Sequence, residues 1–133
     1  MSAVALPLGP ALAAVFVGAG AGACLRLLLN ETLNARWPTM PLGTLVANLL
    51  GGYLVGVAIA FFATRAELSP LWRTLAITGF LGGLTTFSAF SAEVVGALMR
   101  GQPGWALATA AAHLLGSLAL TALGVVSVRW WVG

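Results

Sequence analysis

The chain has 133 residues, of which 60% are hydrophobic and only 7% are charged. A water-soluble domain of this size cannot bury so much apolar surface, so the composition predicts an integral membrane protein. The formal charge of +3 comes from six arginines and three glutamates. These arginines lie singly near the ends of apolar segments and form no basic cluster, which argues against a nucleic-acid partner.

Four apolar segments, each long enough to cross a bilayer, follow one another along the chain. They run over residues 3–29, 40–63, 71–99 and 104–131. Short polar connections separate them, and the first of these, residues 30–38, is expected to be an interfacial loop. The sequence shows no internal repeat and no soluble domain. We therefore expect an all-α membrane protein with a single domain of four transmembrane helices.

The first two segments each carry one conspicuous polar side chain. Arg26 follows a run rich in glycine and alanine; its guanidinium either reaches the lipid headgroups or faces an aqueous vestibule, where it attracts anions. Asn48 lies near the middle of the second segment. Its amide either bonds a neighbouring helix or faces a pore. Thr44 lies one turn earlier on the same face, which favours a polar stripe.

The third segment contains the stretch Gly79–Glu93 (GFLGGLTTFSAFSAE), which is a poor continuous helix. Three glycines in five positions weaken the helical ladder, and two adjacent threonines offer competing hydroxyls. This pattern predicts a break near Gly82–Thr86. An unpaired peptide group exposed to lipid costs several kcal/mol, so a break must lie against protein or water. Broken helices at membrane depth are typical of ion or substrate sites.

Polar and aromatic side chains follow the predicted break. Phe87 and Phe90 are three residues apart and share one helix face, which suits lipid contact or core packing as well as a binding site. Ser88 lies beside them. Glu93 comes late in the segment, as either an ordinary interfacial carboxylate or a functional one. In the fourth segment His113, Ser117 and Thr121 follow at intervals of four, which favours a polar track facing water over a single helix–helix hydrogen bond.

The arginines give no preferred orientation. With the four segments alternating in direction, three arginines fall on each side of the membrane, so the positive-inside rule does not choose between the two insertions. Two opposed copies then pair about an axis in the membrane plane, as inverted repeats do within larger transporters. Four thin helices are also too few to enclose a pore. Both arguments predict a homodimer. No catalytic constellation is visible, so an enzyme is not expected.

Three motifs, in order and at fitting spacing, resemble those of the Fluc-type (CrcB) fluoride channels. They are Gly79–Glu93, Gly43–Gly51 (GTLVANLLG) and Gly20–Arg26 (GAGACLR). The resemblance implies an antiparallel, dual-topology homodimer in the bacterial inner membrane, in contact with lipid, with two pores that conduct fluoride passively out of the cytoplasm.

The resemblance also implies roles for single residues. It places Arg26 at a vestibule, and it assigns the backbone carbonyls of Gly82 and Thr85 to a structural sodium ion at the dimer interface. The implied pore and polar-track residues are Asn48, Phe87, Phe90, Thr44, Ser88, Glu93, His113, Ser117 and Thr121. Two positions depart from the family pattern: Ala89 replaces a frequent threonine, and His113 stands where several relatives are expected to have tyrosine.

The chemistry of the residues suits an anion. Amides and hydroxyls can donate hydrogen bonds to fluoride, and the edge of an aromatic ring carries positive potential. Two other functions stay open. A small multidrug-type proton antiporter requires a carboxylate within the membrane, and Glu93 is the only acid in the apolar segments. An accessory subunit would conduct no ion by itself.

Overall fold

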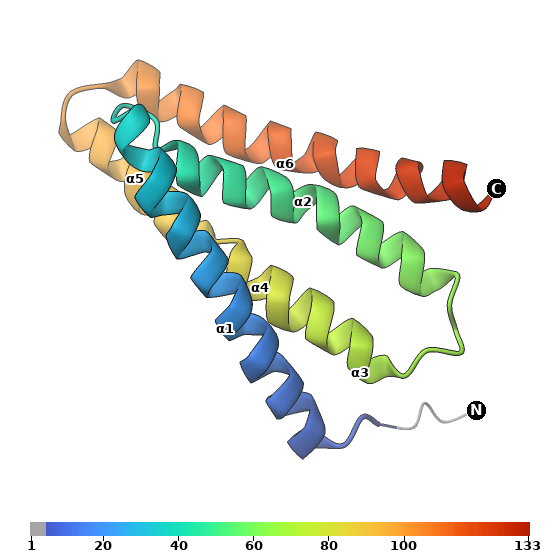
Figure 1. Ribbon diagram of the computed structural model, residues 1–133. Coiled ribbons are helices and arrows are strands. Elements are labelled where there is room, and N and C mark those ends of the chain that lie inside the picture. The colour runs from blue at the N-terminus through green and yellow to red at the C-terminus, as the bar shows by residue number, and fades with distance from the viewer. Residues whose placement is uncertain (1–4) are drawn as a thin grey trace.

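The computed structural model describes residues 5–133, and within them four helical segments are long and apolar enough to cross a bilayer. The four-helix, all-α membrane architecture predicted from the sequence is therefore confirmed. Residues 3 and 4, at the start of the first predicted segment, lie outside the described residues. The polypeptide runs back and forth along the bundle, so α2 and α6 point the same way (Figure 1).

The first segment is α1 (Leu8–Leu33), which continues into the short 3-10 helix η1 (Asn34–Arg36). Helical structure therefore occupies much of the stretch 30–38, which we expected to be a loop. The Thr32 hydroxyl donates to the carbonyl of Leu28 at 2.8 Å, a bond within the last turn that a helical threonine makes without leaving the ladder. Asn34 then accepts a hydrogen bond from the Gly43 amide at 2.7 Å, which satisfies a free donor at the start of α2.

The continuous helices α2 (Leu42–Ala63) and α6 (Pro103–Val132) lie side by side along the bundle (Figure 1). Glycine permits their close approach: a Cβ atom added at Gly56 would overlap the Thr121 carbonyl, and one added at Gly124 would overlap the Tyr53 carbonyl. The Thr121 hydroxyl donates to the carbonyl of Gly52 at 2.9 Å, and Tyr53 donates to the Ser127 hydroxyl at 3.3 Å. The pair is thus held by shape and by two interhelical hydrogen bonds.

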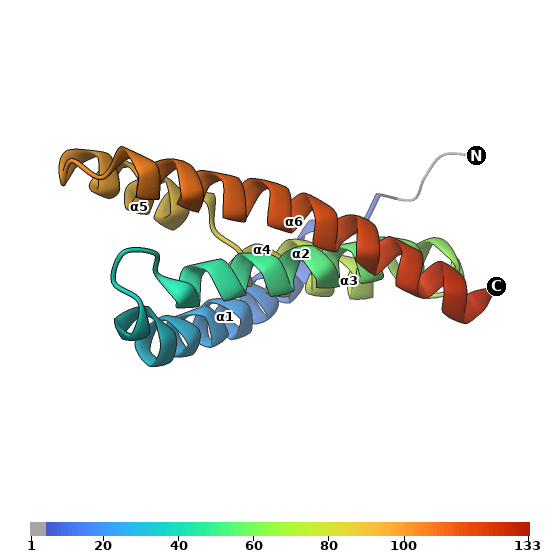
Figure 2. The ribbon, with the colours of Figure 1, turned by 90° about the horizontal axis from the view of Figure 1, so that it is seen from above.

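The third membrane segment is built from four pieces. They are α3 (Pro70–Arg73), the π-helix η2 (Thr74–Leu81), α4 (Gly82–Leu84) and α5 (Phe87–Met99). Thr85 and Thr86, between the last two, have extended backbones with ψ of 154° and 124°. The break thus falls within the predicted stretch. Beyond it α5 leaves the line of α4 and runs beside the first half of α6 (Figure 2).

The glycines of this segment do not make the break, contrary to the reason given by the sequence pattern. Gly82 is helical, with φ −63° and ψ −36°. Gly83 packs so closely against α1 that an added Cβ would overlap Ala19, and Gly22 of α1 packs in the same way against the Phe80 carbonyl. Glycine therefore serves helix contact here, and the chain leaves the helix only at the two threonines.

Aromatic side chains mark the two ends of the bundle. Trp37 and Trp105 meet edge-to-face at one end, with ring centroids 6.0 Å apart. Exposed Trp72, Trp130 and Trp131 lie at the other end. Two such belts are typical of membrane–water interfaces and place the break between them, at membrane depth.

Candidate functional site

A groove of about 360 Å³ runs past the break in the third membrane segment. α2, the break with the start of α5, and α6 each contribute one side of it. The lining residues are Asn48, Gly51, Gly52, Val55, Thr85, Thr86, Phe87, Phe90, His113, Leu114, Ser117, Leu118 and Thr121. Six of the predicted pore residues are among them: Asn48, Phe87, Phe90, His113, Ser117 and Thr121.

Asn48 holds the break together. The Thr86 amide donates to Oδ1 of Asn48 at 2.7 Å, and Nδ2 of Asn48 donates to the Thr86 carbonyl at 2.9 Å. In a continuous helix the Thr86 amide would instead donate to the carbonyl of Gly82. The Asn48 side chain therefore replaces the partner that the Thr86 amide loses at the break. It also adds a donor to the Thr86 carbonyl, which as the N-cap carbonyl accepts the first hydrogen bond of α5. Inside a bilayer, the backbone groups that a helix break frees must find hydrogen-bond partners within the protein.

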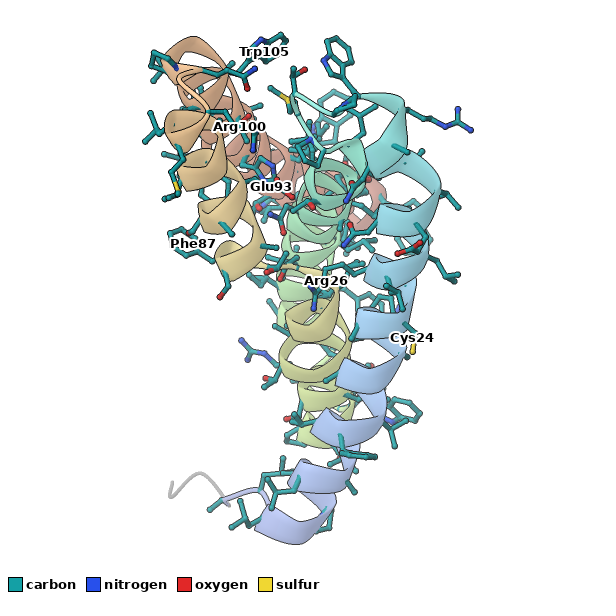
Figure 3. The ribbon with its side chains drawn as sticks, turned by 90° about the vertical axis from the view of Figure 1, so that its left-hand side faces the viewer. Cys24, Arg26, Phe87, Glu93, Arg100 and Trp105 are labelled. Atoms are coloured by element: carbon teal, nitrogen blue, oxygen red, sulfur yellow. The ribbon has the colours of Figure 1, made fainter. Side chains whose placement is uncertain are left out.

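Two further groups complete the break. The Thr86 hydroxyl accepts a hydrogen bond from the Ala89 amide at 3.1 Å and so caps the start of α5. On the other side, Nε of Arg26 donates to the Gly83 carbonyl at 3.2 Å. Arg26 points from α1 toward the break, at mid-height of the bundle (Figure 3). Its guanidinium therefore lies at the carboxyl end of the helical run Pro70–Leu84, where the helix dipole is negative, and not toward the lipid headgroups.

The aromatic rings continue the groove toward α6. Phe87 and Phe90 meet edge-to-face, with centroids 5.5 Å apart and an angle of 68°. Phe90 stacks on the His113 ring at 4.7 Å and 29°. Phe87 is 79% exposed, whereas His113 is only 4% exposed. Nδ1 of His113 lies 3.0 Å from Nδ2 of Asn48, so the histidine joins α6 to the amide that holds the break.

Glu93 lies behind the groove, with Thr44. It points from α5 into the bundle (Figure 3), and its Oε2 is 3.9 Å from Nε2 of His113. The fully buried Thr44 lies next to its carboxylate. Oε2 of Glu93 and Nε2 of His113 are both buried, and neither has a hydrogen-bond partner within residues 5–133. Of the two alternatives left open for Glu93, this position argues against the ordinary interfacial carboxylate, because the side chain is only 17% exposed.

The remaining predicted residues lie elsewhere. Ser88 is exposed at the start of α5 and does not line the groove. The carbonyls of Gly82 and Thr85 lie at the end of α4, where a helix leaves its last carbonyls without intrahelical donors. Ser117 and Thr121 line the groove, but the Thr121 hydroxyl already donates to backbone carbonyls at 2.8 and 2.9 Å. The polar track is therefore in part a set of helix contacts.

The fold and the groove define a multi-pass membrane protein with a polar path beside a broken helix, an arrangement typical of ion and substrate pathways. Residues 13–125 match the family described as "CrcB-like protein, Camphor Resistance (CrcB)", and the chain belongs to this family. The resemblance found in the motifs is thereby confirmed.

Relatives of high identity carry one common name. The chain is 60% identical to a "Fluoride-specific ion channel FluC" of Burkholderia cenocepacia, over 90% of this chain and 93% of that protein. Proteins of the same name from Burkholderia thailandensis and Burkholderia pseudomallei are 59% and 58% identical over the same shares. These relatives favour the fluoride-channel prediction over the multidrug antiporter and the accessory subunit.

Proposed function

We propose that this chain is a fluoride-selective ion channel, which lets fluoride leave a bacterial cytoplasm passively across the inner membrane. The observation that carries this proposal is the 60% identity, over 90% of the chain, to a protein named as a fluoride-specific channel. The groove at the break supports it, because it brings ring edges and hydrogen-bond donors together at membrane depth. Channels of this kind catalyse no covalent chemistry.

The groove residues suit a small, strongly hydrated anion. Fluoride can cross only if the protein replaces its water with donors. In the edge-to-face pair Phe87 and Phe90, the edge of one ring points at the face of the other. The ring edges that this contact does not use carry positive potential and are available to an anion. The Ser117 hydroxyl lies on the opposite wall of the groove. A narrow path with these contacts would favour fluoride over the larger chloride.

A second copy of the chain would close this path. Phe87 is 79% exposed in one chain, although it lies at membrane depth beside the groove. The even split of the arginines supports opposite insertion of two copies, which would give an antiparallel homodimer with two equivalent pores. We expect Phe87 of each copy to lie against its partner.

The carbonyls at the break suit a structural sodium ion. Arg26 already donates a hydrogen bond to the Gly83 carbonyl. The carbonyls of Gly82 and Thr85 lie at the end of α4, where no further helical turn supplies donors to them. Neutral carbonyl oxygens are typical ligands of alkali cations at unwound helices. Gly82 and Thr85 from two copies would hold the ion where the two breaks meet. There it would supply positive charge that stabilises the dimer and offsets the burial of an anion.

Fluoride efflux from liposomes tests the channel. We expect purified native protein to release fluoride without any proton gradient and to release no chloride. We expect Phe87→Ile and Asn48→Asp to slow fluoride release by at least about tenfold, the factor that corresponds to one lost interaction of about 1.4 kcal/mol. Vesicles that stay impermeable to fluoride would overturn the proposal. Equal leakage by all three proteins would overturn the assignment of the groove as the pore.

Labelling from the two sides of the membrane tests the opposed insertion. In a Cys24→Ala background, Ala66→Cys adds one thiol in the exposed connection between α2 and α3. A membrane-impermeant thiol reagent should label about half of the protein from each side of sealed vesicles, because the arginine balance gives no preference. Labelling of nearly all molecules from one side only would contradict dual topology while leaving fluoride conduction untouched.

A further inference from the structure

The amide of Asn48 has only one orientation that agrees with its contacts. The Thr86 amide can only donate, so the Asn48 atom 2.7 Å from it must be the oxygen. The Thr86 carbonyl can only accept, so the atom 2.9 Å from it must be the nitrogen. Exchanging the two atoms would place donor against donor and acceptor against acceptor. The backbone of the break therefore fixes the Asn48 side chain.

This orientation decides the state of the neighbouring histidine. Nδ2 of Asn48 has two hydrogens, and one of them is used by the Thr86 carbonyl. The other faces Nδ1 of His113 at 3.0 Å, so Nδ1 has to be an acceptor and carries no proton. The ring proton of the neutral imidazole then lies on Nε2. Stacking on Phe90 at 4.7 Å and almost complete burial hold the ring in this position.

We infer that Asn48 is a positioning residue: it fixes the buried His113 ring as the Nε2–H tautomer, with this ring N–H on the side of the ring that faces Glu93. Nε2 of His113 has no hydrogen-bond partner within residues 5–133, since Glu93 at 3.9 Å is beyond hydrogen-bonding distance. The tautomer follows from these contacts alone and does not rest on the proposed fluoride conduction.

Nitrogen-15 NMR tests the tautomer without any flux measurement. The sequence contains a single histidine, so protein labelled with 15N-histidine gives one pair of ring signals. At neutral pH in detergent micelles we expect Nδ1 to resonate as an unprotonated nitrogen and Nε2 as a protonated one. A protonated Nδ1, or an even mixture of the two tautomers, would overturn the inference.

A substitution at position 48 tests the cause. Asn48→Asp keeps the shape but turns an oxygen toward Nδ1, so we expect the Nδ1 signal to shift to that of a protonated nitrogen. Tyr53→Phe is the matched control, because it removes another α2–α6 hydrogen bond, to Ser127, and should leave both ring signals in place. An unprotonated Nδ1 in Asn48→Asp would show that Asn48 does not set the tautomer.

Discussion

The α2–α6 pair and the segment Pro70–Met99 differ in how their backbones are satisfied inside the bilayer. α2 and α6 are continuous, so each helix pairs its own peptide groups, and their glycines bring backbone against backbone. Pro70–Met99 is also apolar enough to span the membrane but leaves the ladder at Thr85 and Thr86. Side chains from α1 and α2 supply the partners there. In lipid, a continuous helix needs neighbours of suitable shape, whereas a broken one needs polar neighbours at fixed positions.

The largest expected effect comes from removing the polar neighbour of the break. Asn48→Leu leaves the Thr86 amide without a partner and removes one of the two donors to its carbonyl, and an unsatisfied buried group costs about 1–3 kcal/mol. We expect the free energy of unfolding in detergent micelles to fall by about 3 kcal/mol, measured by circular dichroism during denaturation.

The matched substitution lies on the same helix. Tyr53→Phe removes one side-chain hydrogen bond between continuous helices, at 3.3 Å, and should cost no more than about 1 kcal/mol. If Asn48→Leu and Tyr53→Phe cost the same, the break does not depend on the Asn48 amide, and the contrast between the two regions fails.

A smaller effect is expected where the continuous pair depends on shape alone. Gly56→Ala adds a Cβ atom that would overlap the Thr121 carbonyl, so the two helices have to separate. Overpacking of this kind costs typically about 1–3 kcal/mol, and we expect about 2 kcal/mol in the same unfolding measurement. Gly20→Ala is the control, because a Cβ atom there meets nothing within 4 Å. It should be neutral or stabilise by up to about 1 kcal/mol, since alanine favours helix. Equal losses would contradict the close packing of α2 and α6.

The sequence was sufficient for the four membrane helices and for the position of the break, because apolar length and the pair of threonines are local signals. It did not predict what holds the break. Asn48 and Thr86 are 38 residues apart, and Asn48 and His113 are 65 apart, so no spacing within one helix relates them. The glycines led to a wrong explanation of the break for a related reason. A sequence pattern does not distinguish a glycine that weakens a helix from one that lets a neighbouring helix pack closely. The partner of Gly83 is α1, which only the packing reveals.

The same limit applies to the polar residues. Periodicity placed His113, Ser117 and Thr121 on one face of α6, and all three line the groove. It could not show that the Thr121 hydroxyl is used by backbone carbonyls, or that Glu93 faces His113 from another helix. The sequence predicts which residues share a helix face. Which acceptor each hydrogen-bond donor uses depends on the residues packed around it.

The smallest effect is expected from a substitution that removes the Thr86 hydroxyl but keeps the backbone hydrogen bonds of this residue. Thr86→Val keeps the shape and the extended preference of the residue but loses the hydroxyl that caps α5. The loss of an N-cap costs about 1 kcal/mol, and the backbone bonds to Asn48 should survive. Thr78→Val is the control, because Thr78 is exposed on η2 and caps no helix. A loss for Thr86→Val as large as that for Asn48→Leu would mean that the hydroxyl, and not the amide of α2, keeps the chain out of the helix at this point.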